Sequence, residues 1–164
     1  MVSGLHLKIS AVLLVLPLHA QPCALTPSEA ALKLYKHHRD FVHNGATGQL
    51  FSVALSSVVN RSVRLAQQAG EVGPIDYDFW TDAQDGDASP EAEATLSAKS
   101  PGTTYVLLSY WFRLGPNYRP VPKTAVVELS QAASGCWQVE DLHREQRSVR
   151  SILELAKTTR EHTR

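Results

Sequence analysis

The stretch IDYDFWTDAQDGD, residues 75–87, marks the point where the chain changes from helical to strand patterning. Eight of the 16 carboxylates in the chain lie within residues 71–93, and residues 65–98 contain neither Lys nor Arg. The stretch nevertheless carries two large aromatic residues, Phe79 and Trp80, near its centre. Since acidic segments that stay disordered are poor in aromatic residues, it predicts an ordered loop, called the acidic loop below, between a helical half and a strand half.

The sequence before the acidic loop begins with a well-defined helix start. Thr26-Pro27-Ser28-Glu29 has the pattern of a capping box, in which Thr26 is the cap and Glu29 follows three residues later. Asn44-Gly45 is typical of a helix end, so one amphipathic helix is expected between these two signals. Its buried positions are predicted to be Ala31, Leu34, Tyr35, His38, Phe41 and Val42.

A second helical region is expected over residues 49–68. Ser56 and Ser57 are candidate caps, because serine side chains accept hydrogen bonds from the first N–H groups of a helix, and a break near Leu55 is left open. Glycine and proline gather after residue 69 and end the region. Its predicted core positions are Leu50, Phe51, Ala54, Val58, Val59 and Leu65.

The sequence after the acidic loop predicts four strands. Aromatic and β-branched residues gather in residues 103–113, while residues 94–98, 123–130 and 136–142 alternate apolar with polar residues. Turn sequences of the type Ser-Pro-Gly, Gly-Pro-Asn and Ala-Ser-Gly separate these runs. Strands joined by short turns form an antiparallel meander, so the pattern predicts an α+β domain whose N-terminal helices pack on one concave face of a curved sheet.

The longest predicted strand, residues 103–113, carries large side chains on both faces. Because a strand with one solvated face alternates apolar with polar residues, both faces of this strand are expected to be at least partly covered. One face consists of Tyr105, Leu107 and Trp111, and the other of Val106, Leu108, Tyr110 and Phe112.

Residues 143–164 form a charged segment with a further helical pattern. Val149, Ile152, Leu153 and Ala156 recur at helical spacing, which predicts a C-terminal amphipathic helix. Six basic and five acidic residues are interspersed from residue 140 onward. A solvated outer face is therefore favoured over a membrane or nucleic-acid surface.

Residues 1–20 have the features of a secretory signal peptide, namely Lys8, a short apolar run and Ala20 at the expected cleavage site. A retained membrane anchor is the alternative, although spanning a bilayer takes about 20 apolar residues. Without this segment, 15 Lys and Arg residues stand against 16 Asp and Glu residues, and this balance does not favour nucleic acid as a partner. We expect a secreted or periplasmic protein without stable membrane insertion after cleavage.

Cys23 and Cys136 are the two cysteines of the chain. In an oxidising compartment they are expected to form a disulfide bond, which loop-entropy arguments value at roughly 4 kcal/mol. Two unpaired thiols, one of them buried, are the alternative.

The order of these features resembles the family catalogued as domain of unknown function 3828, which includes the YbjP-like bacterial envelope proteins. The most specific part is Asp78 to Asp85, where the family has Asp, Pro, an aromatic residue, two variable positions and then Ala-Gln-Asp. This chain has Phe79 in place of the proline, and it keeps the Ala-Gln-Asp and a closing WQVEDL at residues 137–142. The resemblance covers residues 29–142 and implies an NTF2-like cone, in which helices lie across a strongly curved sheet and can leave a pocket at the open end.

With the signal-peptide pattern before it and the helical pattern after it, the resemblance leads us to expect a signal peptide (residues 1–20), an NTF2-like domain (residues 21–142) and a C-terminal helical extension (residues 143–164), which lies outside the resemblance. The resemblance supplies no catalytic residues, because none are established for the family.

Two conceivable metal sites do not fit their motifs. With Gly86 as the sixth position of an EF-hand loop, Thr81 and Ala83 would occupy ligand positions one and three. The three histidines within residues 37–43 do not share one helical face, as a zinc site would require. The chain also lacks a phosphate loop and a dinucleotide fingerprint, so neither a metal nor a cofactor is expected.

The acidic loop supplies the candidate binding residues. Asp is foremost a turn residue, so Asp78 and Asp85 are expected to bond backbone groups while Phe79 or Trp80 fills the core. For a pocket beside the loop, the predicted binding residues are Tyr77, Asp78, Trp80, Gln84, Asp85 and Tyr110.

Two functional classes stay open at this point. The first, favoured because enzyme motifs are lacking, is a non-catalytic exported envelope protein that binds a protein partner or a small-molecule ligand. The second is an enzyme with a cone-shaped pocket, in which a desolvated Asp78 or Asp85 acts as acid or base near Tyr77. Carboxylates clustered without a basic partner would repel one another if buried, so most are expected to face water.

Overall fold

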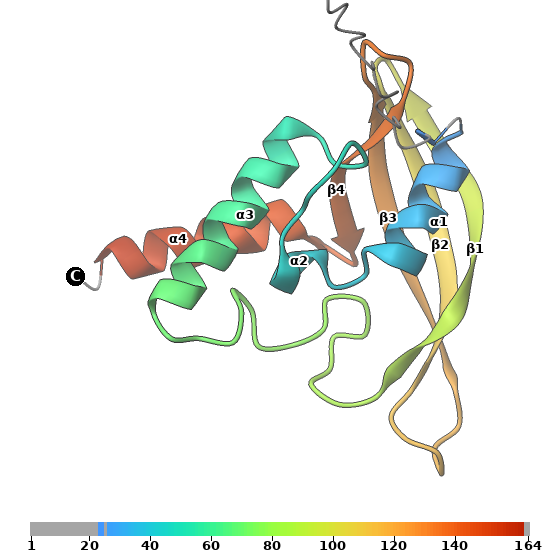
Figure 1. Ribbon diagram of the computed structural model, residues 1–164. Helices are drawn as coiled ribbons and strands as arrows, with labels where there is room; N and C mark the ends of the chain where they lie inside the picture. Colours follow the sequence, from blue (N-terminus) through green and yellow to red (C-terminus); the bar gives the residue numbers. More distant parts are fainter. Residues whose placement is uncertain (1–22, 25, 163–164) are drawn as a thin grey trace, which may run out of the picture.

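The structure is a computed structural model that describes residues 23–24 and 26–162, with side chains described as far as Ala156. It combines helices with an antiparallel sheet, and Figure 1 shows the helices on one side of that sheet. The α+β class predicted from the sequence is therefore confirmed. The elements are α1 (Pro27–His37), α2 (Phe41–Asn44), α3 (Val53–Gln68), β1 (Asp87–Ser100), β2 (Thr103–Arg113), β3 (Val121–Gln131), β4 (Trp137–Arg144), β5 (Arg147–Ser148) and α4 (Val149–His162).

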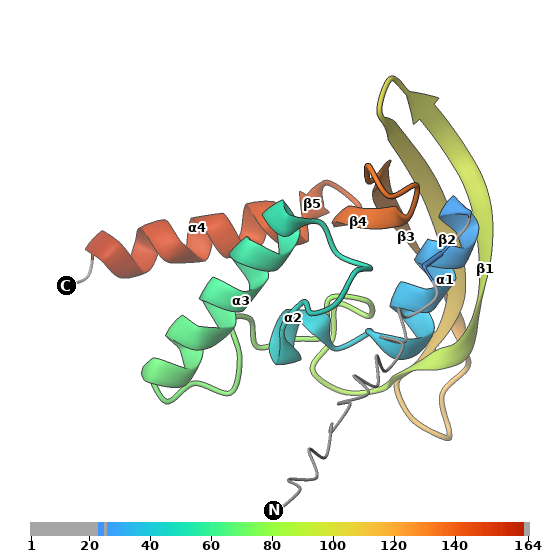
Figure 2. The same cartoon turned by 45° about the horizontal axis from the view of Figure 1, so that its top comes forward.

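Within the described residues, five strands form one meander in the order β1-β2-β3-β4-β5, and every neighbouring pair is antiparallel. All three predicted turns lie between successive strands. Figure 2 shows β1 and β2 bending around α1, which gives the sheet its concave inner face. The two-residue strand β5 was not predicted from the sequence.

Strand β1 is longer than the sequence predicts, because it begins at Asp87 instead of residue 94. Its first half is rich in Ala and Glu and contains Pro90, which are residue types of low strand propensity. Pairing with β2 over almost its whole length overrides this local preference. The strand stays irregular, with register shifts between Ala88 and Ala92 and between Leu96 and Ala98.

Helix α1 starts with the predicted capping box. The Thr26 hydroxyl accepts a hydrogen bond from the Glu29 N–H (3.1 Å), and the Glu29 carboxylate accepts one from the Thr26 N–H (3.0 Å). These two bonds satisfy N–H groups that have no partner within the helix. Leu34 and Tyr35 then face the sheet and are fully buried.

The single helix expected between Thr26 and Asn44 is instead two helices, α1 and α2. The chain turns at Arg39 and Asp40, and α2 is capped at its end by Gly45, whose φ of +98° is a conformation that favours glycine. The break is stabilised from a distant part of the sequence, because the Trp80 indole N–H donates to the Arg39 carbonyl oxygen (2.9 Å). A continuous helix would use that carbonyl within its own hydrogen-bond ladder.

The second helix, α3, begins later than expected, and the prediction that Ser56 or Ser57 caps it is wrong. Ser52 is the cap, because its hydroxyl accepts from the Leu55 N–H (3.2 Å). Leu50 ends a turn and Phe51 forms an isolated parallel bridge with Val139 of β4, where the Val139 N–H donates to the Leu50 carbonyl (2.7 Å). Both residues are buried as predicted, but against the sheet edge and not on a helix.

The core lies between the concave face of the sheet and the helices. Alternate residues of β2 point into it, so Val106, Leu108 and Tyr110 are buried, whereas Trp111 on the opposite face is 54% exposed. Tyr105 and Leu107 on that outer face are partly exposed. The prediction that both faces are partly covered therefore holds near the start of the strand but not at Trp111.

The predicted C-terminal helix is present as α4 and packs against α3 and β4. Val149 and Leu153 are buried in the main core, and Ile152 packs against it. The Asp141 carboxylate in β4 accepts from the Arg150 N–H (3.2 Å), and so satisfies a group at the start of the helix. The segment after residue 142 thus contributes to the same core as the rest of the domain.

The predicted disulfide bond joins Cys23 to Cys136, with a Cα–Cα distance of 5.4 Å. It connects the segment before α1 to the turn between β3 and β4, where the Trp137 N–H also donates to the Ala24 carbonyl (3.3 Å). The predicted signal peptide, residues 1–20, lies outside the described residues. Among the described helices, none combines the length and the apolar character that crossing a membrane requires.

Candidate functional site

Asp78 holds the acidic loop in shape. Its carboxylate accepts a hydrogen bond from the Trp80 N–H (2.8 Å). In the backbone, the Asp78 N–H donates to the Ala83 carbonyl (3.0 Å), and the Asp78 carbonyl accepts from the Asp82 N–H (2.8 Å). These bonds close a tight turn, in which Asp82 adopts a positive φ of 57°. The expectation that Asp78 bonds backbone groups is met, and its carboxylate is engaged within the loop.

Trp80 fills the core, with 1% of its surface exposed. Its ring lies edge-on to Tyr35 (5.2 Å between ring centres, 87° between planes) and to Tyr110 (6.0 Å, 77°). Tyr35 and Tyr110 also contact each other (5.1 Å). These three rings, which we call the aromatic hub, join α1, the acidic loop and β2 on the concave side of the sheet.

Both hydroxyl groups of the hub donate to backbone carbonyls. The Tyr110 hydroxyl donates to the Trp80 carbonyl (2.6 Å), and the Tyr35 hydroxyl donates to the Ser89 carbonyl. Burial is the main cause that raises the pKa of Tyr110 above its ordinary value. The phenol is thereby kept neutral and occupied, which suits a structural role better than proton transfer.

Two arginines from the far end of the sequence bind the acidic loop. Arg144 is 4% exposed and donates to the Phe79 carbonyl (3.1 Å). Arg147 forms an ion pair with Asp82 (2.8 Å), and its guanidinium lies over the Tyr77 ring (5.8 Å). The hydrogen bond to Asp82 is the main cause that raises the pKa of Arg147. The loop therefore has basic partners, which its own sequence does not contain.

The structure places the six predicted binding residues in different surroundings. Trp80 and Tyr110 are buried in the hub, and Tyr77 and Asp78 are partly buried beside it. Gln84 and Asp85 are exposed. In the described part of the chain, no group of three or more His, Cys, Asp or Glu side chains is placed to hold a metal ion.

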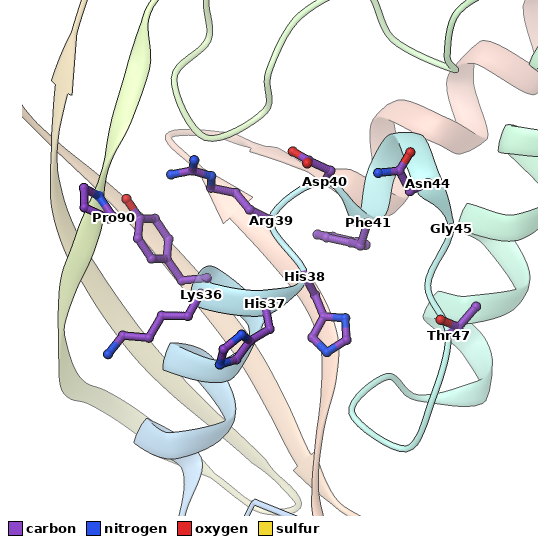
Figure 3. Close-up of a pocket in the computed structure, with 11 residues that line it drawn as sticks. Lys36, His37, His38, Arg39, Asp40, Phe41, Asn44, Gly45, Thr47 and Pro90 are labelled. Carbon is purple, nitrogen blue, oxygen red and sulfur yellow. The ribbon is translucent and has the colours of Figure 1, made fainter. Parts of the chain in front are cut away.

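A groove that sequence reasoning did not identify begins at the turn between α1 and α2 (Figure 3). Its first hollow has a volume of about 440 Å³, and Figure 3 shows Lys36 and His37 on α1, Arg39 and Asp40 at the turn, and Thr47 across from them. Arg39 is already engaged, because it donates to the Ala88 carbonyl (3.1 Å) and lies over the Tyr35 ring.

Two further hollows adjoin this one through shared lining residues. A second, narrow hollow beside the disulfide shares His38 and Thr47 with the first, and a third hollow of about 700 Å³ along α3 shares Gly48 and Gln49 with the second. We call the three together the basic groove. Among the described residues that line it, Asp40 is the one carboxylate, and the basic side chains are Lys33, Lys36, His37, His38, Arg39, Arg61 and Arg64.

His38 contributes little positive charge to the groove near neutral pH. Burial is the first cause that lowers its pKa, followed by the charges of Lys33 and His37. Its ring also packs edge-on against Phe51 (5.4 Å). His38 was predicted as a buried position of one continuous helix, and it is instead partly buried just after the end of α1.

A second surface lies on the outer face of the sheet around Trp111. Trp111 is directly opposite Pro122 of β3, and three residues of β1, Ser89–Glu91, bulge opposite it, where the Ser89 hydroxyl accepts from the Trp111 N–H (3.1 Å). Glu93 is paired with Ser109 on the same face. We call this surface the Trp111 shelf, and its hollow of about 400 Å³ is lined by Glu91, Glu93, Ser109, Trp111, Pro122 and Thr124, among others.

One sign of the Trp111 shelf is visible in the sequence, namely a tryptophan on the strand face opposite Val106, Leu108 and Tyr110. The basic groove has no such sign in the sequence, because Lys36, Arg39, Arg61 and Arg64 lie in separate segments and come to border one groove only in the folded protein. No family model, curated protein or solved structure matches this chain.

Proposed function

We propose that the protein is a non-catalytic, exported envelope protein that binds a protein partner at the Trp111 shelf. The observation that carries the proposal is Trp111, which is 54% exposed in a hollow on the outer face of the sheet. Tryptophan buries a large area in protein interfaces and is enriched among the residues that dominate binding energy. An exposed tryptophan set in a hollow is therefore a natural contact point.

The interior of the cone supports a surface function. Tyr35, Trp80 and Tyr110 occupy the space between α1 and the concave face of the sheet, and their polar atoms are bonded to backbone carbonyls. The groups considered for catalysis are placed elsewhere, since Asp78 is engaged in its turn and Asp85 is exposed. Binding on an outer surface accounts for these features better than a reaction inside the cone.

The charges beside Trp111 favour a basic segment as the contacting part of the partner. Glu91 and Glu93 lie on one side of the ring, and Pro122 and Thr124 lie on the other. Lys123 also borders the hollow, but its ammonium group lies over the Phe112 ring (5.6 Å). A Lys or Arg side chain of the partner would stack on the Trp111 ring and would also be attracted by the carboxylates of Glu91 and Glu93.

Export and family membership are part of this proposal. The Cys23–Cys136 bond supports an oxidising compartment such as the periplasm. The helices on a bent antiparallel sheet are the arrangement that the resemblance to the domain of unknown function 3828 family and its NTF2-like cone implies.

The test is a chemical cross-linking experiment with the disulfide-bonded protein as bait against exported and envelope fractions of the source cells. Wild type is compared with Trp111→Ala, with Glu93→Lys, and with Val72→Ala as a control at a fully exposed apolar residue outside the shelf. A saturable partner is expected, and Trp111→Ala should reduce its recovery at least tenfold, as expected for an interface hot spot worth about 2 kcal/mol. Glu93→Lys should also reduce it, and Val72→Ala should not.

Equal recovery by wild type and Trp111→Ala contradicts the proposal, as does the lack of any saturable partner. A fluorescence spectrum and a melting curve of each variant establish that the fold is kept.

A further inference from the structure

Arg61 and Arg64 lie one turn apart on α3 and border the largest hollow of the basic groove. The hollow has a volume of about 700 Å³ and lies between α3, the chain before it and the start of β4. Its other lining residues carry no charge, and they include Gln49, Val53, Ser56, Ser57, Asn60 and Gln138.

The positive charge of this pair is not compensated locally. Helix α3 contains no Asp or Glu, and neither guanidinium takes part in an ion pair within the described part of the chain. Like charges this close on one helix face destabilise it by about 0.2–0.5 kcal/mol. A bound anion would remove that repulsion.

The wall facing the arginines is held in place by side-chain amides. The Asn60 side-chain oxygen accepts a hydrogen bond from the Ala46 N–H (2.8 Å), and the Asn60 side-chain amide donates one to the Ala46 carbonyl (3.0 Å). Gln138 donates to the Gln49 carbonyl (3.1 Å). The segment between α2 and α3 is thus fixed to both α3 and β4, which prepares the hollow for a ligand before binding.

The hollow also has an apolar rim. Val53, the first residue of α3, is 86% exposed and borders the same hollow as the two arginines. Ser56 and Ser57 lie between Val53 and the arginines and carry hydroxyl groups that can donate to an oxyanion. Cationic, hydroxyl and apolar groups therefore follow one another along a single helix face.

We infer that the α3 end of the basic groove binds an organic anion. Its carboxylate or phosphate group is held by Arg61 and Arg64, whose planar guanidinium groups match such oxyanions in two-point hydrogen bonds. Its apolar part lies against Val53. This site is independent of the Trp111 shelf, because the two share no lining residue.

The test is an NMR titration of the disulfide-bonded protein with sodium hexanoate, with inorganic phosphate, and with sodium chloride at matched ionic strength. Hexanoate should cause saturable shifts of amide signals from Val53 to Arg64, and it should bind more tightly than inorganic phosphate. Sodium chloride should not reproduce these shifts. Arg61→Gln and Arg64→Gln should each weaken hexanoate binding about tenfold or more, the loss expected for a charge-assisted hydrogen bond.

Two further variants separate the parts of the inference. Val53→Ser should weaken hexanoate but not phosphate, since it removes only the apolar contact. Arg119→Gln, at an exposed arginine outside the hollow, should leave both titrations unchanged. Shifts that do not saturate, shifts that chloride reproduces, tighter binding of inorganic phosphate than of hexanoate, or wild-type affinity in both arginine variants would each overturn the inference.

Discussion

The Tyr110 hydroxyl is the clearest case in which one atom links stability to pH. It donates to the Trp80 carbonyl (2.6 Å) inside the aromatic hub, and burial raises the pKa of Tyr110 while the Arg144 charge acts in the opposite direction. In the unfolded chain a tyrosine loses its proton near pH 10. The folded protein keeps this proton to a higher pH than the unfolded chain does. The contribution of Tyr110 to the free energy of unfolding is therefore fully present below about pH 10, and it decreases as the pH rises above that value.

Tyr110→Phe should therefore change both the size and the pH dependence of the free energy of unfolding. At pH 7 the variant should lose about 1–2 kcal/mol, because the Trp80 carbonyl is left without its donor. Between pH 10 and 11.5 its stability should fall less steeply than that of the wild type. Urea unfolding at pH 7, 10 and 11.5 measures both effects, and Tyr118→Phe, at an exposed tyrosine, is the control. Parallel pH curves for wild type and Tyr110→Phe would show that Tyr110 ionises as in the unfolded chain.

At the scale of elements, the acidic loop is attached to the turn between β4 and β5. Arg144 donates to the Phe79 carbonyl from a buried position, whereas the ion pair of Arg147 with Asp82 is largely exposed. Exposed ion pairs contribute about 0–1 kcal/mol because water and salt screen them. A buried charged donor to a carbonyl contributes more, and its removal also leaves the carbonyl unbonded.

Arg144→Ala should consequently destabilise the protein by about 2–3 kcal/mol, and Arg147→Ala should have a much smaller effect because solvent screens its ion pair. The effect of Arg147→Ala should shrink further in 1 M salt, while that of Arg144→Ala should persist. Chemical denaturation gives the two free energies, and limited proteolysis shows whether the acidic loop opens first. Equal losses for the two variants would mean that Arg144 does not hold the loop.

The elements also show where sequence reasoning ends. The capping box at Thr26 and the turns between strands were predicted because their hydrogen bonds and dihedral angles are set within four residues. The start of α3 was not, since Ser52, Ser56 and Ser57 offer similar caps. Ser52 caps the helix because the residues just before it, Leu50 and Phe51, are paired with Val139, almost ninety residues later in the sequence. The same limit applies to β5, whose pairing with β4 involves only four residues.

At the scale of the whole molecule, the fold brings together charges that the sequence separates. Phe79 or Trp80 was predicted to fill the core because both are large aromatic residues among carboxylates, and the structure buries both. The basic partners of the loop, Arg144 and Arg147, lie about 65 residues away in the sequence. The basic groove likewise combines α1, α3 and β4. Neither set could be found without the arrangement of the helices on the sheet.

The Cys23–Cys136 bond acts on the whole chain, because the cysteines are 113 residues apart in sequence. It limits the unfolded chain far more than the folded one, where the Trp137–Ala24 hydrogen bond already holds the two segments together. Cys136→Ser should therefore lower the free energy of unfolding by roughly 4 kcal/mol in the loop-entropy account. For a domain of this size, that loss corresponds to a drop in melting temperature on the order of 10 °C.

Cys23→Ser and the double variant should melt like Cys136→Ser, because all three lack the same bond, and reduction of the wild type should lower its melting temperature to the same value. Mass spectrometry of protein isolated without reductant should find both cysteines protected from alkylation. Melting of Cys136→Ser at the wild-type temperature would show that the folded contacts alone hold the segment before α1. A difference between the two single variants would instead place part of the effect in the packing of Cys136, which is buried beside Trp137.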